Sequence, residues 1–130
     1  MPAFLILPEW TVAAAPQPAL YEWGVRIEDG MITHLAPNAE LRRCFPGVPC
    51  MEAPRQVLSP GFVNAHTHLY GVLAHGIPLG KAPEGFWPFL RDFWWPLVED
   101  RIDHAMLKAA AAWQCAQMIR SGVTSFYDCL

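Results

Sequence analysis

Two histidines separated by one residue, His66 and His68, are the side chains of this sequence best suited to binding a metal ion. Neutral imidazole is the commonest protein ligand of transition metals. In a β-strand, side chains two positions apart project to the same face, whereas on a helix the same spacing points them apart. The pair therefore predicts a metal site only if a strand carries it.

The residues before the pair predict such a strand. Ser59-Pro60-Gly61 is a turn signal, and the apolar run Phe62–His66 that follows has the length of a buried strand. A second architectural unit is therefore expected to begin at this turn. The β-branched and aromatic run over residues 123–127 predicts another strand.

Helices are expected between these two strands. Residues 84–95 are rich in aromatic side chains at helical spacing, and Pro96 should break or kink this helix. Asp103 is a suitable N-cap for a helix that runs to about Ser121, with Gly122 placed to end it. One face of that helix is expected to be apolar: Ala109, Ala112, Trp113, Ala116 and Ile119.

This order of strand, helix and strand is typical of a βαβ unit in a parallel sheet. Active sites of such folds collect at the carboxyl ends of the strands, where His66 and His68 lie.

Earlier residues predict short strands and turns. Leu20–Glu28 alternates as a strand does, Asp29-Gly30 is a strong hairpin turn, and Met31–Leu35 would be the returning strand. A short helical turn is expected over residues 39–44, followed by extended structure from Cys50 to Leu58.

Composition excludes several classes of protein. Of 130 residues, 53% are hydrophobic and 16% charged, and the formal net charge is −3, which fits neither a disordered chain nor a nucleic-acid-binding protein. The long uncharged stretch over residues 56–80 holds prolines, Asn64 and three histidines, so it is expected to be protein interior and not a membrane span. With no signal peptide in view, we expect a cytoplasmic protein whose four cysteines are free thiols.

Beyond spacing, the segment Leu58–Leu69 resembles the first-strand signature of the amidohydrolase superfamily, whose members are metal-dependent hydrolases built on a (β/α)₈ barrel. Three further segments resemble the deaminase and chlorohydrolase branch: His75-Gly76, the stretch from Phe89-Leu90 to Trp95-Pro96, and residues 117–128. The resemblance implies an α/β chain with a small N-terminal β domain, residues 1–56, and the first βαβ of an incomplete barrel, residues 57–130.

For function, the resemblance implies one divalent metal, zinc or alternatively iron, with His66 and His68 as two of its ligands. Metal hydroxide would then remove an amino group or a halide from a small nitrogen heterocycle. No catalytic acid or base is assigned within this chain, because the family's other ligands and proton-transfer groups are expected beyond Leu130.

Two side chains are candidates for binding the substrate. Phe89 stands where relatives have a tryptophan near the substrate, although core packing would equally explain it. Glu99 lies one residue later after Pro96 than a family glutamate that holds the substrate's sugar, so a solvated carboxylate is its alternative role. His75 is expected at the surface, and Asp128 is expected to support the site without binding the metal.

Alternatives remain open at this point. The chain could belong to a cyclic-amide hydrolase resembling dihydroorotase, with two metals, or it could be a catalytically inactive truncated fragment. A barrel needs about 250 residues, so the 130-residue chain alone is expected to be inactive. The expected partner is the heterocyclic substrate, with no nucleic acid and no membrane, and a homodimer is possible for the full-length protein.

Overall fold

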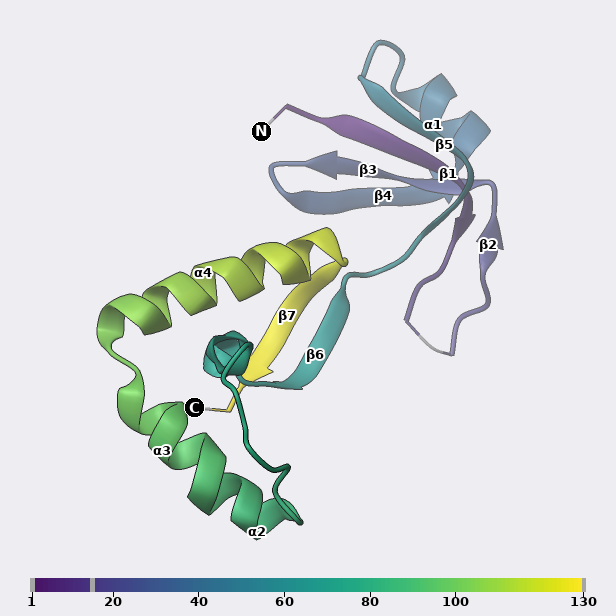
Figure 1. Ribbon diagram of the computed structural model, residues 1–130. Coiled ribbons are helices and arrows are strands. Elements are labelled where there is room, and N and C mark those ends of the chain that lie inside the picture. Colours follow the sequence, from purple (N-terminus) through teal and green to yellow (C-terminus); the bar gives the residue numbers. More distant parts are fainter. Residues whose placement is uncertain (1, 15, 130) are drawn as a thin grey trace. The chain divides into compact units, whose positions relative to one another are not determined.

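The computed structural model describes residues 2–14 and 16–129 and divides into two compact units, Met1–Pro60 and Gly61–Leu130. The first unit is a five-stranded sheet with one short helix, and β1 (Phe4–Thr11) is its central strand (Figure 1). β1 pairs antiparallel with β2 (Leu20–Tyr21) and β3 (Trp23–Glu28), and parallel with β5 (Cys50–Leu58). Two of the core residues, Leu5 and Leu7, come from β1.

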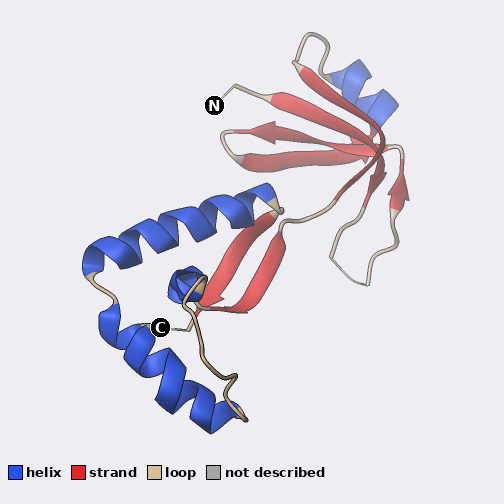
Figure 2. Cartoon of the chain, viewed as in Figure 1, coloured by secondary structure: helices blue, strands red, loops and turns tan. Residues whose placement is uncertain are grey.

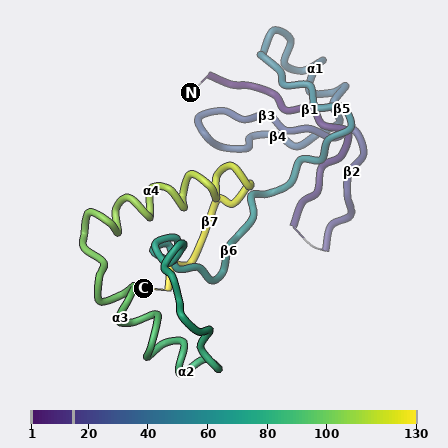
Figure 3. Tube along the Cα trace, in the orientation of Figure 1, coloured from purple at the N-terminus to yellow at the C-terminus, as the bar shows by residue number. Residues whose placement is uncertain are grey.

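The hairpin expected around residue 30 is confirmed. β3 pairs antiparallel with β4 (Met31–Pro37), and the tight turn between them can be followed in Figure 3. Asp29 and Gly30 both have positive φ, 50° and 77°, as a two-residue type I′ turn requires. The strand expected over residues 20–28 is interrupted at Glu22, whose φ of 54° redirects the chain and separates β2 from β3.

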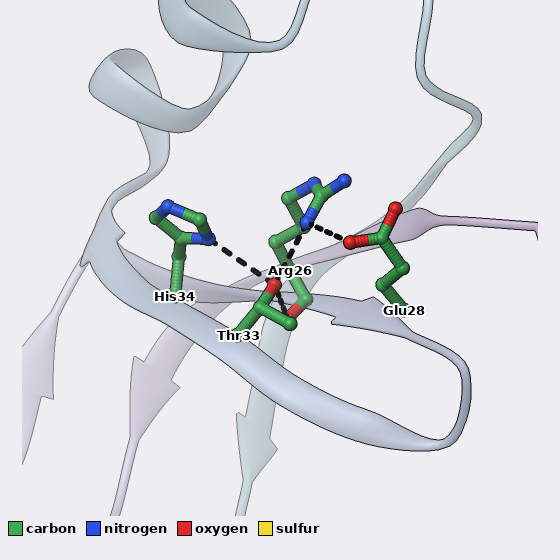
Figure 4. A network of polar contacts seen from close by, with 4 residues as sticks. All are labelled: Arg26, Glu28, Thr33 and His34. Carbon is green, nitrogen blue, oxygen red and sulfur yellow. Dashed lines mark hydrogen bonds and ion pairs between the residues drawn. The ribbon is translucent and has the colours of Figure 1, made fainter.

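A polar network on the hairpin ties β3 to β4 (Figure 4). The Arg26 guanidinium donates hydrogen bonds of 2.9 Å to both the Glu28 carboxylate and the Thr33 hydroxyl, and it stacks over the Phe45 ring at 4.7 Å. This guanidinium lowers the pKa of Glu28. Phe45 follows α1 (Asn38–Cys44), whose Leu41 completes the core of the first unit, so the network lies beside that core.

The division between the units falls later than the sequence-based boundary after residue 56. Val57 and Leu58 pair with Trp10 and Thr11 of β1, so they belong to the sheet of the first unit. Expected extended structure from Cys50 to Leu58 is confirmed as β5.

The second unit has the expected βαβ order (Figure 2). β6 (Phe62–Thr67) and β7 (Val123–Asp128) are parallel neighbours, which confirms both expected strands. The connection between them is helical and contains η1 (Leu69–Ala74), α2 (Phe86–Phe89), η2 (Leu90–Trp94), α3 (Trp95–Leu97), η3 (Glu99–Arg101) and α4 (His104–Arg120). Asp103 caps α4 by accepting a 2.7 Å hydrogen bond from the Met106 amide, as expected.

Helical structure continues through Pro96, although the sequence predicted a break or kink there. Proline has no N–H and its ring collides with the carbonyl four residues earlier, which is Asp92. Over Leu90–Trp94 the hydrogen-bond pattern widens to that of a π-helix, and α3 begins directly afterwards with Pro96 in its first turn. The wider turn lets the helix accommodate the proline.

The apolar face expected for α4 is not the side that packs on the core of the second unit. Trp113 and Ile119 on that face are 58% and 74% exposed, whereas Ala110 is buried and Leu107 packs against the core of the unit. The reason is that apolar residues occur around most of the circumference of α4, so their period does not select one face.

Aromatic residues dominate the core of the second unit. Tyr70, Phe93 and Val98 are buried, and seven partly buried side chains pack around them: Leu73, Ala74, Ile77, Phe89, Trp94, Ile102 and Leu107. Within residues 2–14 and 16–129, no helix is both long enough and apolar enough to cross a bilayer.

Candidate metal and substrate site

The two histidines lie where β6 ends. β6 extends to Thr67, and His68 keeps an extended backbone, with φ −123° and ψ 100°, before η1 begins. The strand alternation therefore continues through His68, and both rings project to the same side. Their Nε2 atoms are 3.3 Å apart. Two nitrogens bound to one tetrahedral zinc at 2.0–2.1 Å lie about 3.3–3.4 Å apart, so the pair fits a shared zinc ion.

Asp128 fixes the backbone beside His68. Its Oδ1 accepts a 3.1 Å hydrogen bond from the Leu69 amide, and the Cys129 amide donates a 2.8 Å bond to the Thr67 carbonyl. The residues on both sides of His68 are thereby bound to the end of β7. The position of His68 therefore depends on how β6 pairs with β7.

Aromatic rings surround His68 on its inner side. Tyr70 and Trp94 lie with ring centroids 5.7 Å and 6.4 Å from it, both edge to face. The His68 Nδ1 atom is buried and has no hydrogen-bond partner among the described residues. In a metal-bound histidine, the N–H of the second ring nitrogen usually donates a hydrogen bond to a polar group. None of the described residues takes this role for His68.

Glu99 lies next to these aromatic rings. Its Oε1 accepts a 2.6 Å hydrogen bond from the Tyr70 hydroxyl and a 2.8 Å bond from Trp94 Nε1. Burial, together with the hydrogen bond to Glu99, raises the pKa of Tyr70 above its usual range. Tyr70 and Trp94 therefore connect Glu99 to His68.

The other sequence candidates are placed less directly. Phe89 packs against Phe93 and Trp94, with ring centroids 5.5 Å away in each case, and so belongs to the aromatic cluster. His75 is exposed after the end of η1. Tyr70 and Trp94 escaped the sequence analysis, and the only signal for them was that Tyr70 continues the alternation of His66 and His68.

Within the part of the chain that the structure describes, no group of three or more histidine, cysteine, aspartate or glutamate side chains is arranged to hold a metal. The site consists of two ring nitrogens, His66 Nε2 and His68 Nε2, that can bind one metal ion, beside the hydrogen-bonded carboxylate of Glu99. Such a combination can hold a metal ion jointly with further ligands and can accept hydrogen bonds from a substrate.

Residues 57–130 match the model of the amidohydrolase family. The chain belongs to the amidohydrolase family. This confirms the resemblance noted on residues 58–69, and the histidine pair that carries it lies within the matched range.

Among curated relatives of this amidohydrolase, a 5-methylthioadenosine/S-adenosylhomocysteine deaminase from Desulforamulus reducens is 35% identical over 121 residues. The match covers 86% of this chain and 26% of the relative, so the chain spans about a quarter of that relative's length.

Two solved structures show that the amidohydrolase fold extends over the chain. An adenosine deaminase from Xanthomonas campestris with bound zinc has a TM-score of 0.75 and 24% identity, with 98% of this chain and 28% of that chain covered. A guanine deaminase from Bradyrhizobium japonicum has a TM-score of 0.76 and 18% identity, covering 97% and 29% respectively.

Proposed function

We propose that this amidohydrolase chain supplies part of the active site of an enzyme that hydrolytically removes an amino group from a nitrogen heterocycle of a nucleoside. The observation that carries the proposal is the 3.3 Å approach of His66 Nε2 and His68 Nε2 at the end of β6. The 35% identical relative named for two adenosine derivatives supports a nucleoside substrate.

In this proposal His66 and His68 hold one zinc ion, with iron as the alternative. When bound, zinc acidifies water enough to supply a nucleophile near neutral pH. Asp128 holds the chain at Leu69 and so keeps His68 in the orientation that binding requires. The other metal ligands and the groups that transfer protons would come from residues beyond Leu130, and β6, α4 and β7 would be the first βαβ of a (β/α)₈ barrel.

Substrate binding is assigned to Glu99 and Phe89. The Glu99 carboxylate lines a cavity of about 300 Å³ together with Tyr70, Ile102 and Leu107, and it would accept a hydrogen bond from a sugar hydroxyl. Phe89 would form part of the aromatic lining of the substrate site, because it packs on Trp94.

The test uses the full-length polypeptide that contains this chain. His66→Ala together with His68→Ala should remove stoichiometric zinc and abolish deamination of 5-methylthioadenosine, whereas His75→Ala, at an exposed histidine outside the pair, should leave both unchanged. Metal analysis and ammonia release measure the two outcomes. Unchanged zinc content in the double variant would overturn the ligand assignment, and turnover of guanine with no turnover of the nucleoside would overturn the substrate class.

We also expect the 130-residue chain alone to have no turnover. The described residues bring together two imidazoles and no third metal-binding side chain, whereas catalytic zinc sites typically use three protein ligands. Ammonia release from 5-methylthioadenosine by the purified chain would contradict this expectation.

A further inference from the structure

Two hydrogen-bond donors converge on a single oxygen of Glu99. The Tyr70 hydroxyl and Trp94 Nε1 both bond Oε1, and they lie 3.3 Å from each other. The three residues come from separate helical segments, η1, η2 and η3. Trp94 and Glu99 are only five positions apart, whereas Tyr70 is brought to them by the tertiary structure of the second unit.

The two donors, Tyr70 and Trp94, belong to or pack on the core, whereas the acceptor Glu99 lies at the surface. Tyr70 is 4% exposed and belongs to the buried core with Phe93 and Val98, and Trp94 packs against that core. Glu99 itself is exposed. An exposed glutamate side chain normally samples several rotamers, and two hydrogen bonds from fixed donors restrict this freedom.

The second carboxylate oxygen is left available. No hydrogen bond from the described residues reaches Glu99 Oε2. Because an ionised carboxylate only accepts hydrogen bonds, Oε2 can interact only with a group that donates one. In an aminated nucleoside the donors are the amino group, which must lie at the metal during deamination, and the sugar hydroxyls.

We propose that Tyr70 and Trp94 are positioning residues that hold the Glu99 carboxylate through Oε1, so that Oε2 stays available for the sugar hydroxyl that the proposed function assigns to Glu99. The inference rests on the proposed function, because it concerns the same site.

The first test is kinetic and uses the full-length, zinc-loaded enzyme. Tyr70→Phe removes one hydroxyl and should raise KM for 5-methylthioadenosine about 3- to 10-fold with kcat changed less than twofold, which corresponds to loss of one hydrogen bond. Inhibition by adenine, which has no sugar, should be unaffected. The matched control is Trp95→Phe, because Trp95 packs on Trp87 and makes no hydrogen bond to Glu99.

A double-mutant cycle separates positioning from a general packing defect. In a Glu99→Ala background, Tyr70→Phe should change KM for the nucleoside less than twofold, because the acceptor through which Tyr70 acts is gone. An undiminished effect of Tyr70→Phe in that background would overturn the inference. Equal losses of nucleoside and adenine binding in Tyr70→Phe would also overturn it.

A spectroscopic measurement keeps the inference testable if the enzyme proves inactive. With 5-fluorotryptophan incorporated, the ¹⁹F resonance of Trp94 is identified by its loss in Trp94→Phe. Both Glu99→Ala and Tyr70→Phe should shift this resonance, because both remove a hydrogen-bond partner of its indole N–H. Absence of a shift in Glu99→Ala would refute the positioning, whereas a shift without any nucleoside turnover would refute only the proposed function.

Discussion

Replacing Asp128 with alanine should release the chain segment that follows His68. The carboxylate accepts the Leu69 amide at 3.1 Å, and Leu69 is buried, so the amide would lose a charged acceptor without full access to water. A hydrogen bond to a charged group contributes about 1.5–3 kcal/mol. If the released amide opens more easily by that amount, its hydrogen exchange should accelerate about 10- to 150-fold.

Amide hydrogen exchange of the 130-residue chain, resolved at Leu69, measures this effect directly. The internal reference is the Met106 amide, which donates a 2.7 Å hydrogen bond to Asp103 and should keep its rate. Asp128→Asn retains a carbonyl acceptor and should show a smaller acceleration than Asp128→Ala. The reasoning is refuted if Leu69 exchanges at the wild-type rate in Asp128→Ala, or if Leu69 and Met106 accelerate equally.

Three further predictions concern packing, pH and capping. Leu41→Ala, at a side chain 1% exposed, should lower the urea midpoint of the first unit and reduce its free energy of unfolding by about 2–5 kcal/mol. Leu35→Ala, at a side chain 43% exposed, should reduce that free energy far less. Arg26 lowers the pKa of Glu28 in the folded chain, so the stability that Glu28 contributes is present above the ordinary pKa of a glutamate side chain and is lost as the pH falls through the folded pKa. Glu28→Gln should therefore weaken the fall of the urea midpoint between neutral pH and pH about 3. Asp103→Ala should reduce helicity and destabilise the second unit by about 1 kcal/mol, and Asp103→Asn should restore most of this in thermal unfolding followed by circular dichroism.

Local signals in the sequence were sufficient for β4, β5, β6 and β7 and for the histidine pair, whereas the central strand β1 was not predicted and the strand expected over Leu20–Glu28 is divided into β2 and β3. Asp29-Gly30 predicts its turn because few other pairs tolerate positive φ at both positions. His66 and His68 could be assigned to one face because the apolar run before them predicts a strand, and strand alternation is independent of the rest of the fold.

Features that depend on tertiary contacts were not predictable in the same way. Trp94 donates a hydrogen bond to Glu99, whereas the neighbouring Trp95 packs edge to face on Trp87. The sequence does not distinguish the two tryptophans, because Tyr70, which bonds both Trp94 and Glu99, lies 24 positions before Trp94. For a related reason the sequence does not indicate which side of α4 packs inward, since a helix that is apolar on most sides is oriented only by its neighbours.

The hydrogen bond between Leu69 and Asp128 spans 59 residues of sequence, and this has a consequence for synthesis. At about 5–20 residues per second, a ribosome needs roughly 3–12 s to add those residues. During that interval β6 has been made but its partner β7 has not. The first unit can complete its sheet during that time, whereas the histidine pair acquires its final geometry only after the last residues of β7 have emerged.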